Sequence, residues 1–303
     1  MQIPRLVIAA PMSGSGKTTM VTGLIAALAA RGLSVAPFKV GPDYIDPTYH
    51  TFAAGRACRN LDAWMLPPDR VRALFAHHAA DTDLALVEGV MGLFDGFSGS
   101  DDTGSTAHLA RILDAPVLLV LDVSAMARSA AAIVQGMRDF DPRVHVAGVL
   151  LNRVGSAAHA QMVTDAIESE VGVPVAGYLT RDDALNLPER HLGLVPTLEP
   201  GRWQVWLDTA REKIAATVNL DQVLELARRA PPLPPAEQDP FIFEKESQAV
   251  IAVARDSAFT FLYEDNLDLL RAAGANIAFF SPLNDRTLPR GTQGIYLCGG
   301  FPE

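Results

Sequence analysis

"RLVIAAPMSGSGKTTMVTGLIAALAARG", residues 5–32, is the stretch that decides the fold class of this chain. A short apolar run at 5–10 is followed by a Gly/Ser-rich loop and then by apolar residues that recur at helical spacing from Val21 to Leu28. Gly32 stands where such a helix would end. The stretch therefore predicts a strand, a loop and a helix, in which the loop N–H groups and the helix N-terminus favour a bound phosphate.

The loop itself, "APMSGSGKTT" at 10–19, departs from a strict phosphate-binding loop because Pro11 stands where the first glycine is expected. A Gly/Ser-rich turn with an unrelated lysine is the alternative, but the strand and the helix on either side favour a nucleotide site. We expect Lys17 to reach the β- and γ-phosphates and Thr18 to hold Mg²⁺. The residues expected to surround the phosphates are Ser13, Gly14, Ser15, Gly16, Lys17, Thr18 and Thr19.

Further apolar runs alternate with helical segments after this loop. The runs lie at 33–40, 83–90, 116–123 and 145–154. Continuous apolar strands separated by helices are typical of a parallel sheet that is covered on both faces. We therefore expect an α/β domain of the P-loop NTPase type at 1–228, built on a mainly parallel sheet.

A proline-rich segment, "ARRAPPLPPAEQDP" at 227–240, interrupts this pattern and predicts a stiff linker at 229–246. An α/β pattern then restarts, with strands expected at 248–256, 276–283 and 294–303 and a helix at 263–275. A doubly wound domain usually needs about 100 residues or more. We therefore expect residues 247–303 to be the N-terminal part of a second α/β domain that is cut short.

The composition is that of a globular protein and excludes several classes of function. The formal net charge of -10 argues against non-specific binding to nucleic acid or to an anionic membrane. Cys58 and Cys298 are too few for a disulfide framework or a zinc cluster. The sequence lacks an apolar run of the roughly 18 residues that span a membrane, and its start does not resemble a signal peptide. We expect a cytoplasmic protein.

Acidic residues follow two of the predicted strands, where a Mg-nucleotide site needs them. The segment "KVGPDYIDPTYH" at 39–50 supplies Lys39, Asp43, Asp46 and His50, and Glu88 ends a very apolar strand. An acid in that position is costly unless it meets a cation. Turn formation is the alternative explanation for the two aspartates, since Pro-Asp and Asp-Pro are common in turns. Because ligands bind beyond the carboxyl ends of the strands in such sheets, we expect these residues beside the phosphate loop.

A Gly/Ser/Asp-rich segment at 95–106, "DGFSGSDDTGST", superficially resembles a calcium loop. Acids are missing at alternate positions and no glutamate closes the segment. We expect instead a flexible loop over the site, with Ser105 capping the helix that follows. His77 and His78 fall on a helix that we expect to be exposed, and we predict no metal site there.

Seven motifs, in order along the whole chain, together resemble the cobyrinate (or hydrogenobyrinate) a,c-diamide synthase family of the corrin pathway. They are "APMSGSGKTT", "PFKVGPDYIDPTYH", "RNLDAWML", "VEGVMGLFDG", "LNRVGS", "LPERHLGL" and "GGFPE". The resemblance implies a first domain similar to dethiobiotin synthetase and a class I glutamine amidotransferase domain, truncated after its oxyanion-loop motif. Members of this family often carry proline in the phosphate loop, which accounts for Pro11.

The resemblance implies ATP-dependent amidation of a corrinoid polycarboxylate in cobalamin (vitamin B12) biosynthesis. The a and c acetates of cobyrinate or hydrogenobyrinate would form acyl phosphates, and ammonia from glutamine would convert them to amides. By resemblance, Thr18, Asp43 and Glu88 hold Mg²⁺, and Lys17 and Lys39 stabilise the charge on the transferring phosphoryl group.

The resemblance also implies roles for other residues. Asp46 would activate or orient the reacting carboxylate, and Asn152 and Arg153 lie where the relatives read adenine. Substrate-side or supporting roles fall to Tyr44, His50, Asn60 and Asp62. The stretch Leu187–Leu194, "LPERHLGL", would close the nucleotide or the substrate side.

In the second domain, Gly299 and Gly300 match the family's oxyanion loop. Cys298 precedes them, but by family order the glutaminase nucleophile and its histidine lie later in the chain. We therefore expect Cys298 to be a small apolar filler at the end of a strand. If the chain ends at Glu303, we expect it to lack glutaminase activity and to use free ammonia, provided that the synthetase domain folds alone.

Three alternatives stay open. An Ni-sirohydrochlorin a,c-diamide synthase shares these motifs, although "NLDAWMLPP" and "EGVMGLFDG" favour the cobyrinate enzymes. The linker and the second domain argue against a dethiobiotin-synthetase-type carboxylase, and a ParA-like regulatory ATPase would not need "PDYIDPTYH". The expected partners are a corrinoid and glutamine or ammonia, without nucleic acid or membrane, and a homodimer is left open.

Overall fold

The computed structural model describes residues 2–185, 187, 200–234, 239–243 and 248–300. These residues fall into two compact units, the first ending in the proline-rich segment and the second beginning at Asp239. Each unit is an α/β structure, as the sequence predicts.

The first unit is built on a seven-stranded sheet in which every neighbouring pair of strands is parallel. The sheet order is β3-β2-β4-β1-β5-β6-β7. The strands are β1 (Arg5–Ala9), β2 (Val35–Val40), β3 (Arg59–Leu61), β4 (Leu84–Glu88), β5 (Val117–Asp122), β6 (Val146–Val154) and β7 (Val175–Thr180). Every residue of β1, β2 and β4 is buried, which explains why these strands are apolar throughout instead of alternating.

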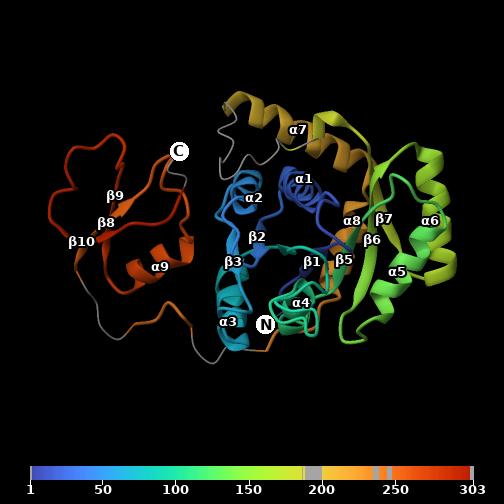
Figure 1. Ribbon diagram of the computed structural model, residues 1–303, viewed down its shortest axis with the longest axis horizontal. Helices are drawn as coiled ribbons and strands as arrows, with labels where there is room; N and C mark the ends of the chain where they lie inside the picture. The colour runs from blue at the N-terminus through green and yellow to red at the C-terminus, as the bar shows by residue number, and fades with distance from the viewer. Residues whose placement is uncertain (1, 186, 188–199, 235–238, 244–247, 301–303) are drawn as a thin grey trace. The chain divides into compact units, whose positions relative to one another are not determined.

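Helices cover both faces of this sheet, with α1, α2 and α7 above it and α3 and α4 below it in Figure 1. The helices of this unit are α1 (Lys17–Ala30), α2 (Asp46–Ala54), α3 (Pro68–Ala79), α4 (Thr106–Ile112), α5 (Ser129–Asp139), α6 (Ala157–Val171), α7 (Pro200–Thr217) and α8 (Leu220–Arg228), with a 3₁₀ turn at Asp183–Leu185. On the lower face Phe38 of β2 meets Phe75 of α3, with ring centroids 5.0 Å apart. The prediction of a sheet covered on both faces is confirmed.

Helix α1 is the most enclosed helix of the first unit, because it lies between the sheet and α7. Its one glycine, Gly23, allows the close approach: a Cβ there would come within 2.8 Å of the Ile214 side chain on α7. Leu24, Ile25 and Leu28 are fully buried. The helix that begins at the phosphate loop is therefore held rigidly in the core.

The start of the predicted linker packs against the first unit. The buried guanidinium of Arg5 donates to the carbonyl of Pro231 over 2.7 Å and to the carbonyl of Leu113 over 2.7 Å. Leu233 is buried as well. Since a buried guanidinium needs acceptors on every side, these contacts hold Pro231 near the amino end of β1. The linker bounds of 229–246 stay a prediction.

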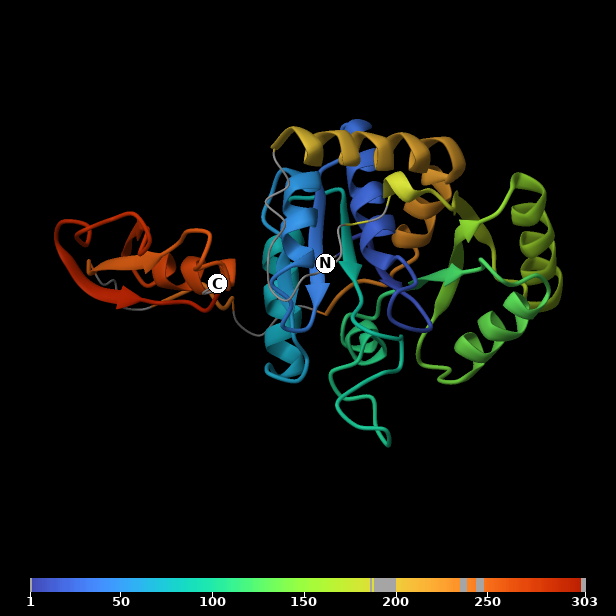
Figure 2. The same ribbon diagram turned by 45° about the horizontal axis from the view of Figure 1, so that its top comes forward.

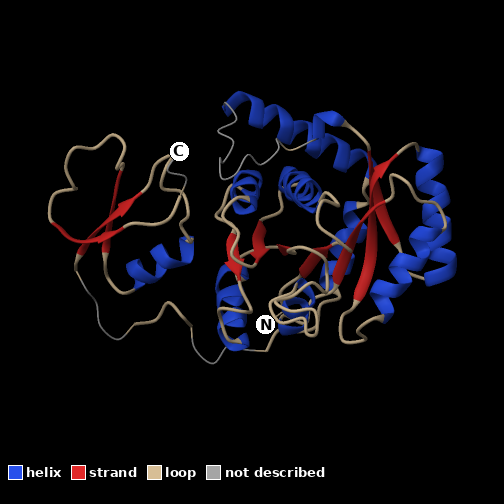
Figure 3. Ribbon diagram, in the orientation of Figure 1, coloured by secondary structure: helices blue, strands red, loops and turns tan. Residues whose placement is uncertain are grey.

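The second unit contains a three-stranded parallel sheet in the order β10-β8-β9 and one helix, α9 (Figure 3). Its elements are β8 (Val250–Ala254), α9 (Glu264–Ala272), β9 (Asn276–Phe280) and β10 (Thr292–Tyr296). They match the predicted strands and helix in type and order. Throughout the described residues of both units, each helix is too short or too polar to cross a membrane.

Candidate functional site

The carboxyl ends of β1, β2 and β4 meet at one edge of the seven-stranded sheet. In Figure 2 the blue and teal strands point to the lower edge, and the teal loop 89–105 extends beyond it. The phosphate loop follows β1, and the segment 41–45 follows β2. The prediction that these segments share an edge is correct, because β2 and β4 are direct neighbours and β4 lies beside β1.

The phosphate loop folds as a turn that only glycine can complete. Gly16, at the N-cap of α1, has φ 87°, in the left-handed region. A Cβ on Gly16 would lie 2.1 Å from Nδ2 of Asn152, which donates to the carbonyl of Ser15 over 2.8 Å. Asn152 stands near the carboxyl end of β6, two strands away from β1 in the sheet, and its side chain holds the loop in place.

Lys17 is the first residue of α1 and is mostly buried. Its Nζ donates to the carbonyl oxygen of Met91 over 2.5 Å, in the loop that follows β4. Burial lowers the pKa of Lys17, against the opposite effect of Glu88. The backbone of Met91 is left-handed, with φ 47°, and this turn aims the carbonyl at the lysine. This contact could not be predicted from the residue types, because the acceptor is a main-chain atom.

Glu88 is the centre of a buried polar network at the end of β4. Its Oε1 accepts hydrogen bonds from Oγ1 of Thr18 over 2.8 Å and from Nζ of Lys39 over 3.1 Å. Its Oε2 contacts Nε2 of His50, whose Nδ1 lies 3.1 Å from Oγ1 of Thr22. Burial alone would raise the pKa of Glu88, but Lys39 and His50 outweigh it and lower that pKa well below its usual range. The cation expected beside this acid is Lys39.

Lys39 lies among three carboxylates. In the sheet register it stands directly opposite Glu88 on β4. Its Nζ is 2.9 Å from Oδ2 of Asp46 and 3.8 Å from Oδ2 of Asp43. Burial would lower the pKa of Lys39, but the three carboxylates, Glu88 first, raise it above its usual value. The lysine is therefore a permanent cation, and its side chain is only 3% exposed.

Asp46 begins α2, and its pKa is raised whereas that of Glu88 is lowered. Burial, and then the charge of Glu88, raise its pKa from 3.8 to about 6, against the opposing effect of Lys39. Its neighbour Asp43 accepts hydrogen bonds through Oδ1 from the backbone N–H groups of Ile45 and Asp46. These hydrogen bonds show Asp43 in a turn, and its role as a Mg²⁺ ligand stays a prediction.

Known proteins are similar in sequence to this chain over almost its whole length. Residues 6–195 match the family model described as CbiA, CobQ/CobB/MinD/ParA nucleotide binding domain. The chain is 50% identical to the cobyrinate a,c-diamide synthase of Dehalococcoides mccartyi (strain CBDB1), covering 100% of this chain and 66% of that protein. It is 47% identical to the hydrogenobyrinate a,c-diamide synthase of Streptomyces coelicolor (strain ATCC BAA-471 / A3(2) / M145), covering 99% of this chain and 68% of that protein.

The chain belongs to the cobyrinate and hydrogenobyrinate a,c-diamide synthase family. The hydrogenobyrinate a,c-diamide synthase of Thermobifida fusca (strain YX) is a further relative, 50% identical over 99% of this chain and 66% of its own length. The chain thus spans about two thirds of the length of the curated relatives that it matches. The family expected from the seven motifs is confirmed.

Four residues with expected substrate-side or supporting roles differ in position. His50 is fully buried behind Glu88, where it supports that carboxylate and cannot touch a substrate. Asn60 donates through Nδ2 to the carbonyls of Gly41 and Asp43, and so holds the segment after β2. Asp62 accepts through Oδ1 from the backbone of residues 64 and 65. Of the four, Tyr44 and Asn60 are half-exposed, and Tyr44 lies on the loop that carries Asp43.

Asn152 and Arg153, the two residues expected to contact adenine, differ in burial. Asn152 is buried under the phosphate loop, whereas Arg153 is exposed, with φ 55°, and forms an ion pair with Oδ2 of Asp122 over 2.5 Å. Contact with a nucleotide base stays a prediction for both. Of the stretch Leu187–Leu194, only Leu187 lies among the described residues.

The segment at 95–106 is not a calcium loop. Asp102 forms two hydrogen bonds with the guanidinium of Arg111, and Asp101 accepts from Ser98 and from the backbone of Thr103. Ser105 caps α4 by accepting from the backbone of the third residue of that helix over 3.0 Å, as predicted. Asp101 and Asp102 of this segment are therefore already bound by protein groups.

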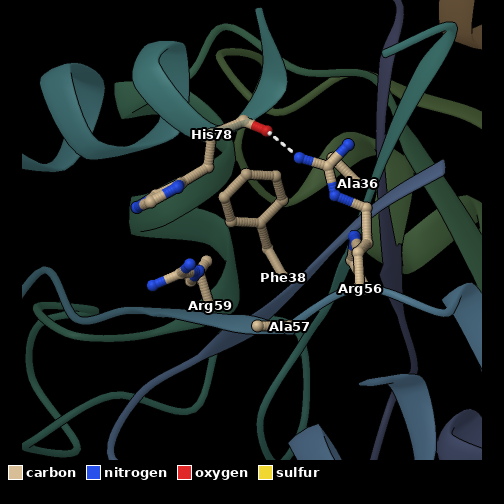
Figure 4. Close-up of a pocket in the computed structure, with 7 residues that line it drawn as sticks. Ala36, Phe38, Arg56, Ala57, Arg59 and His78 are labelled. Atoms are coloured by element: carbon tan, nitrogen blue, oxygen red, sulfur yellow. Dashed lines mark hydrogen bonds between the residues drawn. The ribbon is translucent and has the colours of Figure 1, made fainter. Parts of the chain in front are cut away.

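A small cavity lies behind the edge strand β3, away from the network around Glu88 (Figure 4). Its volume is about 120 Å³, and Phe38, Arg56, Arg59 and His78 are among the lining residues. Arg56 donates from Nη2 to the carbonyl of His78 over 3.1 Å. A nucleotide does not fit a space of a few water volumes, so this cavity is not the nucleotide site.

In the second unit, the Gly-Gly turn after β10 packs tightly against its own sheet. A Cβ on Gly300 would lie 1.7 Å from the carbonyl oxygen of Ala258, and the carbonyl of Gly299 accepts from the backbone of Phe261 over 2.9 Å. Cys298 lies 3.5 Å from the carbonyl of Ala254, and burial raises the pKa of its thiol. A thiol that stays protonated suits the predicted filler role. The oxyanion role of the two glycines stays a prediction.

Proposed function

We propose that this chain carries out the ATP-dependent amidation of the a and c acetate groups of cobyrinate or hydrogenobyrinate in cobalamin biosynthesis. The observation that carries the proposal is the buried Lys39, held between Asp46 and Glu88 beside the phosphate loop. A cation fixed by two acids at this position can receive an anionic substrate next to the γ-phosphate of ATP. Relatives at 47–50% identity bear the corresponding synthase names. Because the reaction consumes ATP, we place it in the cytoplasm.

The residues present fit a magnesium ion. Oγ1 of Thr18 and Oε1 of Glu88 are 2.8 Å apart, and Asp43 offers a further carboxylate. Hard oxygen donors of this kind are the ligands that Mg²⁺ prefers. The three carboxylates around Lys39 exceed the two lysines by one negative charge, which favours a further cation. Bound Mg²⁺ would neutralise charge on the β- and γ-phosphates, and Thr18, Asp43 and Glu88 would hold it.

In the first half of the proposed reaction, an acetate oxygen attacks the γ-phosphorus of ATP. The bond between that phosphorus and the β–γ bridging oxygen breaks, which leaves an acyl phosphate and ADP. Negative charge develops on the transferring group, and cations stabilise it. Lys17, at the start of α1, and Lys39 supply this charge. Neither residue forms a covalent bond, so catalysis here consists of positioning and electrostatics.

In the second half, ammonia attacks the acyl carbon, a C–N bond forms, and the bond from that carbon to the phosphate oxygen breaks. The nitrogen must lose a proton as phosphate leaves. Asp46, with a pKa of about 6, is ionised often enough at neutral pH to accept it. In its protonated form the same group can donate a hydrogen bond to the substrate carboxylate and orient it. We propose that glutamine is the source of the ammonia, with Gly299 and Gly300 in the oxyanion loop of an amidotransferase domain.

Product analysis tests this proposal. The protein is incubated with ATP, Mg²⁺ and ammonium, with either cobyrinate or hydrogenobyrinate, and the products are identified by mass spectrometry. We expect two amide groups on at least one of the two substrates, and loss of both in Asp46→Asn. Asp221→Asn is the matched control, because that exposed acid pairs with Arg31 far from the site. Hydrolysis of ATP without any amide on either corrinoid would refute the proposal.

A further inference from the structure

Four large apolar side chains are exposed at the same edge of the sheet as the proposed catalytic residues. We call them the apolar rim: Met12, Trp64, Met91 and Phe97. Met12 belongs to the phosphate loop, Trp64 to the turn after β3, and the other two to the loop after β4. Three separate loops therefore bring apolar surface to one edge.

The two aromatic side chains of the rim are held in place by defined contacts. The rings of Trp64 and Phe97 are stacked, with centroids 5.8 Å apart and planes 23° apart. Asp62 fixes the backbone under the tryptophan through two hydrogen bonds, and Gly104 lies so close that a Cβ there would be 3.3 Å from Cβ of Trp64. The N–H of Phe97 donates to the carbonyl of Thr103, which folds the loop back. Both rings are nevertheless mostly in solvent, 60% and 75% exposed.

Such exposure is costly, and among the described residues of this unit the other exposed rings, those of Phe52 and Phe140, lie apart from this group. Phe52 packs on Trp203, with centroids 5.7 Å apart, and Phe140 packs on Phe94 at 4.7 Å, each as a single ring on its own helix end. Scattered apolar residues need no explanation, but a contiguous group beside a polar site marks a ligand-binding surface.

The rim is continuous with the phosphate site through Met91. The carbonyl of this residue accepts the hydrogen bond of Lys17, while its side chain is exposed. The carbonyl of Met12 likewise accepts from Oγ of Ser15 inside the phosphate loop. Two of the four rim residues are thus tied to the phosphate loop through their own backbone.

We infer that the apolar rim binds the face of the corrinoid macrocycle while one acetate of the ring edge reaches the γ-phosphate; this inference rests on the proposed function. A macrocycle is a wide, conjugated ring whose faces are apolar, and stacked aromatic and thioether side chains fit such faces. The protein carries a net charge of -10 and an acidic cluster at the site, so long-range charge repels a polycarboxylate. Apolar contact must then supply most of the affinity, and it selects a large ring over a small carboxylic acid.

Titration calorimetry of rim variants tests the inference, with cobyrinate and hydrogenobyrinate as probes and Mg-ATP measured in parallel. Trp64→Ala and Phe97→Ala should each raise the Kd for the corrinoid about tenfold, as expected for the loss of one ring contact. Trp64→Phe should stay within about threefold, because a ring remains. The Kd for Mg-ATP and the kcat at saturating corrinoid should not change. Met162→Ala, an exposed apolar residue on α6, is the matched control and should change nothing.

The outcomes separate the two claims. If the Trp64→Ala, Phe97→Ala double variant binds and amidates the corrinoid with wild-type Kd and KM, the rim assignment is wrong and the proposed function stands. A loss of Mg-ATP affinity equal to the loss of corrinoid affinity also overturns the rim assignment, because the rim would then serve the loop and not the ring. If the unsubstituted protein neither binds nor amidates either corrinoid, the proposed function fails, and the rim assignment fails with it.

Discussion

Replacing Asp46 by asparagine should stabilise the fold while it abolishes the chemistry. The carboxyl of Asp46 is buried, and its pKa is raised from 3.8 to about 6. A group whose pKa is higher in the folded state contributes stability that is fully present below the unfolded pKa. That contribution is lost as the pH rises through the folded pKa. The ionised Asp46 therefore destabilises the ligand-free protein at neutral pH.

The size of the effect follows from the two pKa values. At about 1.4 kcal/mol for each unit of pKa, ionisation of Asp46 costs about 3 kcal/mol near pH 8 and about half of that near pH 5, where the folded carboxyl is mostly protonated. Asparagine does not ionise, so the stability of Asp46→Asn relative to wild type should rise by about 1 kcal/mol between these two pH values. For a unit of this size that is about 2–4 °C in Tm.

The assay is urea and thermal unfolding of both proteins at each pH, without nucleotide or Mg²⁺. Asp141→Asn is the control with the opposite sign, because Arg143 lowers the pKa of Asp141 to about 2. That acid is ionised throughout this range, so its variant should be less stable by an amount that does not change with pH. A constant or shrinking advantage of Asp46→Asn towards pH 8 would refute the reasoning. Amidation by Asp46→Asn should fall at least about 100-fold, with little change in the affinity for ATP.

Three further substitutions and one matched comparison variant test the phosphate loop and the second unit. Lys17→Ala should reduce ATP turnover by about 100-fold or more, and full activity would remove it from the site. Gly16→Ala should abolish ATP binding and lower the free energy of unfolding by about 2 kcal/mol or more, because the new Cβ strains the left-handed backbone and clashes with Asn152. Gly14→Ala has open space at its Cβ and should lower it by only about 1 kcal/mol. Equal losses of stability in melting experiments would contradict this. Cys298→Ser should leave ammonium-dependent synthesis intact, and its loss would mean that the thiol takes part.

The strands could be predicted where both faces of the strand are buried, because such a strand is a continuous apolar run in the sequence. The runs at 33–40 and 83–90 became β2 and β4, and the predicted loop and helix became the start of α1. Strand β3 gave no such signal, because its three residues, "RNL", are short and partly polar. Strand β7 contains Gly177 and is only partly buried, which weakens its pattern. Edge strands are thus the part that local sequence specifies least.

The residues of the site could be predicted from the sequence, but their contacts with one another could not. Lys39 and Glu88 were expected at one edge, yet their direct pairing depends on β2 lying beside β4, which only the sheet order decides. The burial of His50 depends on how α2 packs against α1. One signal was available: Thr22 lies four residues after Thr18 on α1 and so shares its helix face, which places both hydroxyls towards the same network.

The most direct test of the account follows the oxygen atoms of the substrate. Cobyrinate or hydrogenobyrinate labelled with ¹⁸O in its carboxylates is amidated with ATP, Mg²⁺ and ammonium, and the inorganic phosphate is analysed by mass spectrometry. If ATP activates the acetate as an acyl phosphate, each amide formed should deliver one ¹⁸O atom to phosphate. Amide formation with unlabelled phosphate would contradict the claim that the carboxylate attacks the γ-phosphate at the site formed by Lys17, Lys39 and Glu88.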